Sequence, residues 1–93
     1  MIPLHTQISV PQKVVFQEIG AEAVLVDLQA GYYYGLNSTA TNMWRCLVEN
    51  QSPAAALAVL TAAQVAPPDV LERDLLRLTE DLLKRNLLTI AAE

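Results

Sequence analysis

Few side chains in this sequence could carry out chemistry. His5 is the single histidine and Cys46 the single cysteine in 93 residues. A nucleophile needs a positioned base, and a structural zinc site needs four ligands, which one histidine and one cysteine cannot supply. The sequence therefore predicts neither a catalytic centre nor a metal site. We interpret His5 as a surface residue and Cys46 as a small core residue with a reduced thiol.

Carboxylates and glycines offer little more. Glu80 and Asp81 are adjacent, but basic residues follow one helical turn later, which is typical of solvated surface charges. The expected i,i+4 ion pairs join Asp69 to Arg73, Arg77 to Asp81, Glu80 to Lys84 and Asp81 to Arg85. The glycines stand singly, at Gly20, Gly31 and Gly35. Because no glycine-rich loop could surround a phosphate, we predict neither nucleotide binding nor a cofactor.

The run of aromatic residues Tyr32, Tyr33 and Tyr34 is the least ordinary feature of the chain. Consecutive residues of a strand point to opposite faces of the sheet, so at least one ring points away from the core. In one interpretation Tyr32 and Tyr34 join Leu36 in the core while Tyr33 stays at the rim. In the other, the run takes part in binding, and the sequence leaves both open.

The elements that position these tyrosines are predicted from the apolar patterns. Strand-like residues occupy Lys13–Ile19, Ala23–Leu28 and Tyr32–Leu36, with turn residues between them. Three helices follow: one capped by Asn37 or Ser38 and running through Asn50, one from Ser52-Pro53 to Gln64, and one that begins at Pro67-Pro68-Asp69. Asn86 ends the third helix, and Leu87–Ile90 leaves as an extended tail. The fold class is α+β, a three-stranded antiparallel meander followed by three helices.

Burial patterns add detail to this plan. Leucines at positions 71, 75, 78 and 82 form one stripe of the third helix, which we expect to face the core. In the second strand, alternation separates Val24, Val26 and Leu28 from Ala23, Leu25 and Asp27. One face is more apolar, but neither is cleanly polar.

The third strand ends the meander, so one of its edges has no partner in the predicted sheet. Such an edge is blunted by charge, proline or a bulge, or it is used for adding another strand. The stretch Tyr32–Leu36 contains no charged residue and no proline. The sequence therefore favours a strand-addition site for an extended peptide at this edge.

Composition bounds the function further. The hydrophobic share of 53% suits one compact domain, expected over residues 1–93 with a core of about 13–90. A net charge of −4 argues against nucleic-acid binding. The lone cysteine favours a reduced, cytoplasmic setting. No apolar window is long enough to span a bilayer, so we expect no membrane partner.

Several segments resemble one known family at compatible spacing. They are Val24-Leu25-Val26-Asp27-Leu28, Gly31-Tyr32-Tyr33-Tyr34-Gly35-Leu36-Asn37, Trp44, Asp74-Leu75-Leu76 and Leu82-Leu83-Lys84-Arg85-Asn86-Leu87-Leu88. Together they resemble the PqqD-like family, also called RiPP precursor peptide recognition elements, over roughly Lys13 to Ile90. The chain departs from the family at Asn86, where glycine is usual, but asparagine also tolerates the left-handed conformation.

The resemblance implies a winged-helix-like fold that binds the leader segment of a ribosomally made precursor peptide. In that family the leader adds to the third strand, packs beside the third helix and is presented to a separate modifying enzyme or protease. Carried over by position, the peptide-binding residues would be Tyr32, Tyr33, Tyr34, Val70, Asp74, Arg77 and Asp81.

The pathway stays open at this point. A lasso-peptide leader protease is the preferred partner, with pyrroloquinoline quinone synthesis and other modified-peptide pathways as alternatives. A winged helix-turn-helix DNA-binding protein and a dimerising module, whose edge pairs with its own copy, are hypotheses from other classes.

Overall fold

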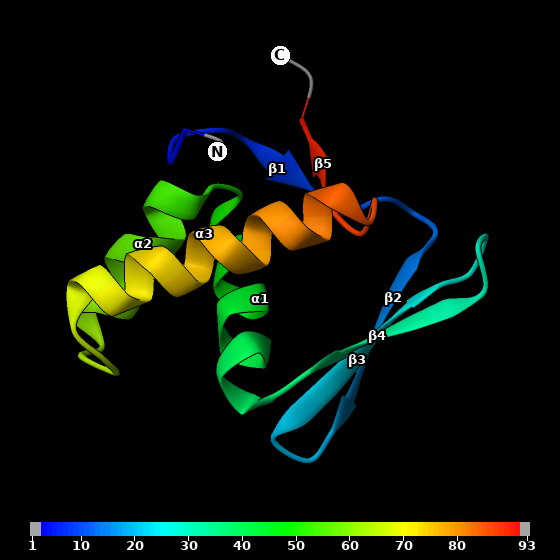
Figure 1. The fold of residues 1–93 in the computed structure, drawn as a ribbon, viewed down its shortest axis with the longest axis horizontal. Helices are drawn as coiled ribbons and strands as arrows, with labels where there is room; N and C mark the ends of the chain where they lie inside the picture. Colours follow the sequence, from blue (N-terminus) through cyan, green and yellow to red (C-terminus); the bar gives the residue numbers. More distant parts are fainter. Residues whose placement is uncertain (1–2, 92–93) are drawn as a thin grey trace.

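The computed structural model describes residues 3–91 and places a three-stranded sheet beside three helices (Figure 1). The sheet contains β2 (Val14–Ile19), β3 (Glu22–Asp27) and β4 (Tyr32–Leu36). The helices are α1 (Ser38–Asn50), α2 (Pro53–Ala62) and α3 (Pro68–Lys84). Two short strands, β1 (Ile8–Ser9) and β5 (Thr89–Ile90), form a separate ribbon. The α+β class and the order of three strands followed by three helices are confirmed.

The sheet is an antiparallel meander in the order β2-β3-β4. Gly20 has a φ of +66° in the turn between β2 and β3, and Gly31 has a φ of +76° at the end of the turn before β4. Both turns use the left-handed conformation that glycine adopts without steric cost. With β3 in the middle, β2 and β4 are the two edges of the sheet.

One hydrogen bond next to the sheet shows which residues of each strand bond to which neighbouring strand. The Leu28 backbone N–H donates to the Lys13 carbonyl at 2.8 Å, so Leu28 bonds toward β2. Successive residues of an antiparallel strand bond to opposite neighbours, so Asp27 and every second residue before it bond toward β4. Their partners in β4 are Tyr32, Tyr34 and Leu36. The backbone groups of Tyr33 and Gly35 therefore point away from β3, toward the open edge.

The face of β3 that packs on the core is the one with a charge. Ala23, Leu25 and Asp27 are buried, whereas Leu28 is 65% exposed. Asp27 is only 1% exposed, yet its carboxylate accepts hydrogen bonds from the backbone amides of Gln29 at 3.0 Å and Ala30 at 2.9 Å. Apolar content alone does not identify the core face here, because the turn satisfies the buried carboxylate.

Asp27 also meets a cation, since the Lys13 ammonium lies 3.0 Å from its second carboxylate oxygen. The Ala30 amide, with further help from Lys13 and the Gln29 amide, holds the pKa of Asp27 below its ordinary value despite the opposing effect of burial. Asp27 therefore stays ionised and ties the end of β3 to the turn before β4 and to the start of β2.

Local side-chain caps define where the first two helices begin. The Asn37 side chain accepts a hydrogen bond from the Ala40 amide at 2.8 Å, and Ser52 accepts one from Ala55 at 3.2 Å. Pro53 occupies the first turn of α2, where its missing N–H costs nothing. The caps predicted at Asn37 and Ser52 are confirmed, and α1 starts directly after β4.

The third helix ends as the sequence predicts. Asn86 has a φ of +61°, the left-handed conformation expected at this position. The Leu87 amide then donates to the Leu82 carbonyl at 2.9 Å, which turns the chain away from the helix axis. Leu87 and Leu88 enter the core directly after this turn.

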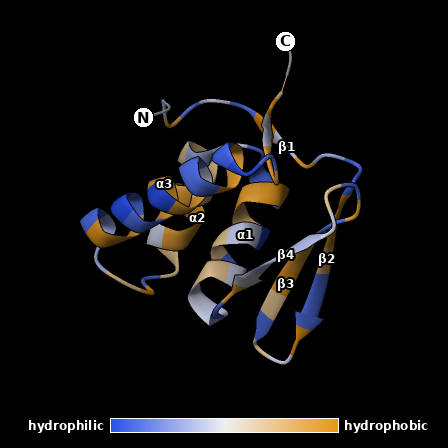
Figure 2. Cartoon of the chain, turned by 45° about the vertical axis from the view of Figure 1, so that its right-hand side comes forward, coloured by the Kyte–Doolittle hydropathy of each residue, from blue (hydrophilic) through white to orange (hydrophobic). Residues whose placement is uncertain are grey.

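One hydrophobic core joins the sheet and the helices. The leucine stripe of α3 faces it, with Leu71, Leu75 and Leu82 buried and Leu78 partly buried. Hydrophobic colours line the inner sides of the helices, and hydrophilic colours follow the outer side of α3 (Figure 2). Tyr32 and Tyr34 pack against this core, while Tyr33 is 74% exposed.

The ribbon of β1 and β5 is absent from the sequence prediction. Ile8 pairs with Ile90 and Ser9 with Thr89, so strands of two residues meet across about eighty positions of sequence. Runs this short carry no measurable alternation, which is why the pattern gave no signal. Within residues 3–91, no helix combines the length and the apolar character that crossing a bilayer requires.

Candidate peptide-binding site

The outer edge of β4 presents an unused row of backbone groups. Tyr33 and Gly35 point their N–H and C=O groups away from β3. Within residues 3–91, no backbone group outside the sheet forms a hydrogen bond with either residue. The other edge strand, β2, carries Glu18, whose carboxylate pairs with Arg45 of α1. Because β4 lacks such a charge, it is the better edge for strand addition.

Helix α3 lies beside β4 in an antiparallel direction (Figure 1). The Tyr32 hydroxyl donates to the Arg85 carbonyl at 2.6 Å, and the Tyr34 hydroxyl donates to the Asp81 carboxylate at 2.5 Å. Two residues of a strand span about 6.6 Å, and four residues of a helix span about 6 Å. Because these two lengths are nearly equal, moving two residues along β4, from Tyr32 to Tyr34, corresponds to moving about one turn along α3, from Arg85 to Asp81.

The Tyr34 and Asp81 pair is the electrostatic centre of this contact. Arg85 donates from Nε to the other Asp81 oxygen at 3.2 Å, and its guanidinium lies 5.3 Å from the centre of the Tyr34 ring. Burial, followed by the hydrogen bond to Asp81, raises the pKa of Tyr34 to about 12. The same hydrogen bond is the main cause that lowers the pKa of Asp81, so both groups keep their protonation states at neutral pH.

A groove opens from Tyr34 along α3. It begins as a cavity of about 320 Å³ between β4, the first turns of α1 and α3. Its lining residues are Tyr34, Asn37, Thr39, Ala40, Met43, Asp74, Arg77, Leu78 and Asp81. We call this space the β4–α3 groove. It brings a polar rim next to the unused backbone edge.

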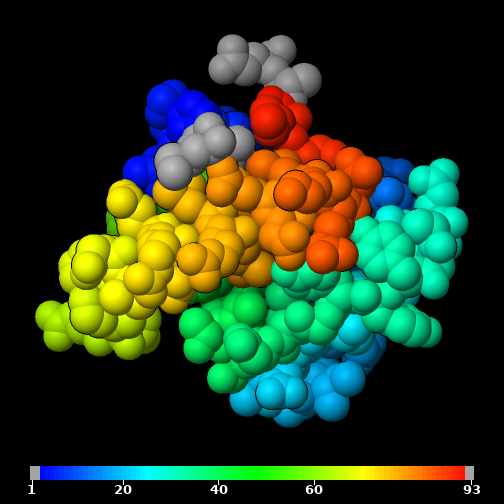
Figure 3. All heavy atoms as spheres, viewed as in Figure 1, coloured from blue at the N-terminus to red at the C-terminus, as the bar shows by residue number. Residues whose placement is uncertain are grey.

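The β4–α3 groove continues into a second, more apolar cavity. This space of about 300 Å³ shares Thr39, Met43 and Asp74 with the first. Its far end is formed by Val65, Val70 and neighbouring apolar residues at the junction of α2 and α3. In the space-filling view, α3 lies across the front of the molecule with the β4 segment under its C-terminal half (Figure 3). An extended chain along β4 would therefore meet first a polar and then an apolar surface.

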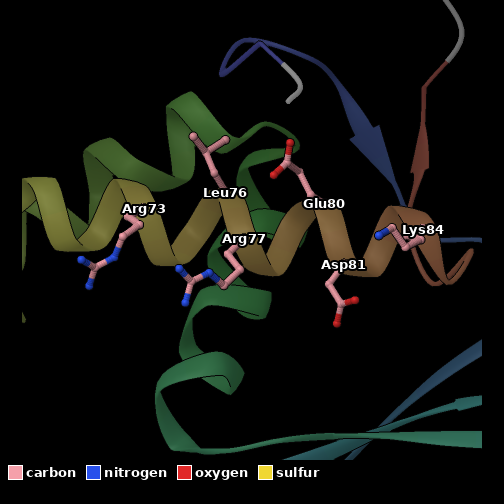
Figure 4. A pocket seen from close by; sticks show the side chains of 6 residues that line it. All are labelled: Arg73, Leu76, Arg77, Glu80, Asp81 and Lys84. Atoms are coloured by element: carbon pink, nitrogen blue, oxygen red, sulfur yellow. The ribbon is translucent and has the colours of Figure 1, made fainter.

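A larger hollow of about 410 Å³ lies on the outer surface of α3 and shares Arg77 and Asp81 with the β4–α3 groove (Figure 4). All six of its lining residues belong to α3, so it is a depression among the side chains of one helix. Figure 4 shows Arg73, Arg77 and Asp81 on one flank of α3, with Leu76 and Glu80 on the opposite flank. The flank that carries Arg77 and Asp81 is the one that borders the β4–α3 groove.

Comparison with known proteins places this arrangement in a family. The family model for coenzyme PQQ synthesis protein D (PqqD) matches residues 22–88, which include the sheet from β3 onward and all three helices. The chain belongs to the PqqD family. No curated protein matches its sequence at a significant level.

Two solved structures share the fold of this PqqD-family chain. The first is TbiB1 in complex with the TbiA(beta) leader peptide, with a TM-score of 0.79 and 29% identity, covering 91% of this chain and 99% of that one. The second is a lasso peptide synthetase B1 complexed with the leader peptide, with a TM-score of 0.77 and 24% identity, covering 89% and 98%. The two likenesses cover nearly the whole length of each protein.

The structure brings most of the residues expected from the PqqD-like resemblance to one place. Four of them, Tyr34, Asp74, Arg77 and Asp81, line the same cavity. Val70 lines the adjoining apolar cavity. The other two tyrosines do not line either cavity: the Tyr32 hydroxyl donates to the Arg85 carbonyl at the end of α3, and the Tyr33 ring is exposed on the opposite face of the sheet. Tyr33 therefore offers its backbone to the edge but no side chain to the groove.

Sequence reasoning missed the contribution of α1 to the groove. Asn37, Thr39, Ala40 and Met43 form its end wall because α1 begins directly after β4. The short connection between β4 and α1 could be predicted from the sequence. The direction of α1, which brings its first turn next to α3, could not. Asp81 also differs from the predicted solvated face: it pairs with Arg85 as expected, yet it accepts from Tyr34 and does not pair with Arg77.

Two kinds of side chain bear on chemistry in the described residues: those that could hold a metal ion and the thiol that could act as a thiolate. Among residues 3–91, no three histidine, cysteine or acidic side chains gather closely enough to hold a metal ion. Burial, followed by the nearby Glu49, raises the pKa of the Cys46 thiol, which disfavours the reactive thiolate. The arrangement is suited to binding an extended chain.

Proposed function

We propose that this PqqD-family protein is a non-catalytic adaptor that binds the leader segment of a ribosomally synthesised precursor peptide and presents it to a separate maturation enzyme. The leader adds as a strand to β4 and sends alternate side chains toward α3. The observation that carries the proposal is the open backbone of Tyr33 and Gly35 beside the β4–α3 groove. Strand addition with side-chain pockets is a common mode of peptide recognition.

The comparisons support this proposal. TbiB1, 29% identical over 91% of this chain, is described as a complex with a leader peptide. Its fold likeness covers 91% of this chain and 99% of that one, with a TM-score of 0.79. We therefore assign the same class of ligand, a leader peptide, to the β4–α3 groove.

For the enzyme partner we propose a lasso-peptide leader protease. The fold shared with a lasso peptide synthetase B1 makes a lasso-peptide gene cluster the first place to look for the precursor. The second candidate is a chaperone role in coenzyme PQQ synthesis, which the description of the family favours. Gene neighbours separate the two, because a transglutaminase-like protease and a cyclase accompany the first, whereas a pyrroloquinoline quinone cluster accompanies the second.

The charge distribution does not favour the DNA-binding hypothesis. Of six basic residues, four pair with carboxylates: Lys13, Arg45, Arg73 and Arg85. DNA affinity arises chiefly from unpaired cations that neutralise phosphates. A salt-sensitive gel shift with duplex DNA would revive that hypothesis.

The direct test is a fluorescence-polarisation titration. The leader of the precursor encoded beside this gene is labelled and titrated with the protein, with a scrambled leader of the same composition as control. We expect saturable binding of the native leader and no binding of the scrambled leader. Binding of neither peptide, or equal binding of both, contradicts the adaptor function. Light scattering with and without leader then shows whether the edge pairs with a second copy instead.

A further inference from the structure

The β4–α3 groove contains one charge without a partner. Its charged lining residues are Asp74, Arg77 and Asp81. Asp74 lies 3.3 Å from Arg73 Nε, and Asp81 is held by Arg85 and a tyrosine hydroxyl. Within the described part of the chain, Arg77 makes no ion pair and no side-chain hydrogen bond. The two carboxylates are thus neutralised internally, and the groove is left with one positive charge.

The register of β4 against α3 sets where this charge acts. Tyr32 contacts Arg85 and Tyr34 contacts Asp81, so two residues along the strand correspond to four along the helix. Extended by one further step, this spacing sets Arg77 against Leu36, the last residue of β4, and Arg77 does line the groove at that end. An added strand has the same alternation as its neighbour, so its residue beside Leu36 points its side chain toward α3.

We propose that Arg77 determines specificity in the leader by pairing with an acidic side chain that lies beside Leu36. This inference rests on the proposed function and names a feature of its ligand. The acidic residue is two positions away from the leader residue beside Tyr34, because alternate residues face the groove. A guanidinium binds a carboxylate through two parallel hydrogen bonds, which fixes the register of the leader as well as its charge.

The net charge of the protein makes a local cation important for binding an acidic side chain. The chain carries a net charge of −4, so an acidic side chain of a ligand is favoured only where a local cation such as Arg77 offsets the overall repulsion. Arg77 is exposed in the free protein and becomes partly desolvated when a strand covers it. Loss of the pair in Arg77→Gln should weaken binding about fivefold, and the repulsion in Arg77→Glu should weaken it about tenfold or more.

The experiment uses the labelled leader encoded beside this gene and the full chain. Lys84→Gln and Lys84→Glu are matched controls, since Lys84 is an exposed cation on the same helix but does not line the β4–α3 groove. Circular dichroism and thermal unfolding show that each variant is folded. Each acidic residue of the leader is then replaced in turn by lysine and titrated against Arg77→Glu.

The proposal is supported if the Arg77 variants bind more weakly, the Lys84 variants bind like wild type, and one acid-to-lysine leader regains affinity for Arg77→Glu. That leader residue should lie two positions from the one that cross-links to a photoreactive group at position 34. Unchanged binding by Arg77→Glu, or equal losses in the Lys84 variants, overturns the proposal while the adaptor function stands. If the wild-type chain binds no leader, both fail.

Discussion

Replacing Tyr33 by proline tests the open edge of β4 directly. The Tyr33 N–H points away from β3, so its loss breaks no bond of the ladder. Proline is tolerated at edge positions of this kind, where the missing donor would face solvent. The variant should therefore fold, while an incoming strand loses a donor and meets the proline ring at the pairing edge.

The magnitude follows from the hydrogen bonds that strand addition can form. Tyr33 and Gly35 together offer two donors and two acceptors. Removing one donor costs the net value of that bond and leaves a peptide carbonyl unsatisfied, together about 2 kcal/mol. That loss corresponds to about a 30-fold increase in the dissociation constant.

The assay is the leader titration with two further variants. Tyr33→Ala removes the exposed ring but keeps the backbone donor, so it isolates the side-chain contribution. Glu18→Pro makes the same backbone change on β2, where the alternation also points Glu18 away from β3. We expect strong loss of binding for Tyr33→Pro alone. If Tyr33→Pro binds like Tyr33→Ala, or Glu18→Pro loses binding equally, strand addition at β4 is refuted.

Three further predictions concern groups that shape the site and its scaffold. Tyr34→Phe removes the donor to ionised Asp81 and should lower the free energy of unfolding by about 1 kcal/mol in urea; an unchanged midpoint would show that the bond contributes nothing. The pKa of Asp27 is lowered on folding, so its stabilising effect is full above the ordinary pKa of about 4 and disappears as the pH falls through the lower folded value. Urea unfolding should thus show Asp27→Asn less stable than wild type at pH 7, with the gap closing toward pH 2.5, and a constant gap contradicts the role of its charge. Asn86→Ala keeps a β-carbon in the left-handed conformation but removes the short polar side chain that makes this conformation tolerable, so it should cost about 1 kcal/mol of stability, whereas Asn86→Gly should be close to neutral; equal effects would argue against backbone strain.

Much of the fold was readable from local patterns. The caps at Asn37 and Ser52, the leucine stripe of α3 and the left-handed Asn86 depend on interactions within a few residues, which sequence spacing records. The ribbon of β1 and β5 depends on contacts between distant segments of two residues each, which leave no periodic signal.

The candidate site shows the same division. Sequence reasoning found the strand Tyr32–Leu36 and predicted that its edge is open to pairing. This was possible because the absence of charged residues and proline from a strand can be read directly from the sequence. It could not separate the three tyrosines by role or see that Asp27, on the less apolar face of β3, is buried. Alternation assigns residues to two faces but does not say which face meets the core.

The sequence by itself determined the local conformations, the strand and helix order and the absence of charge along Tyr32–Leu36, since these follow from side-chain type and spacing. Only the tertiary structure decided that α3 packs antiparallel to β4, with Tyr34 bonded to Asp81 and Arg77 left unpaired in the groove. The physical reason is that such contacts depend on how two elements some forty residues apart are docked by the shared core, and no local pattern encodes that docking.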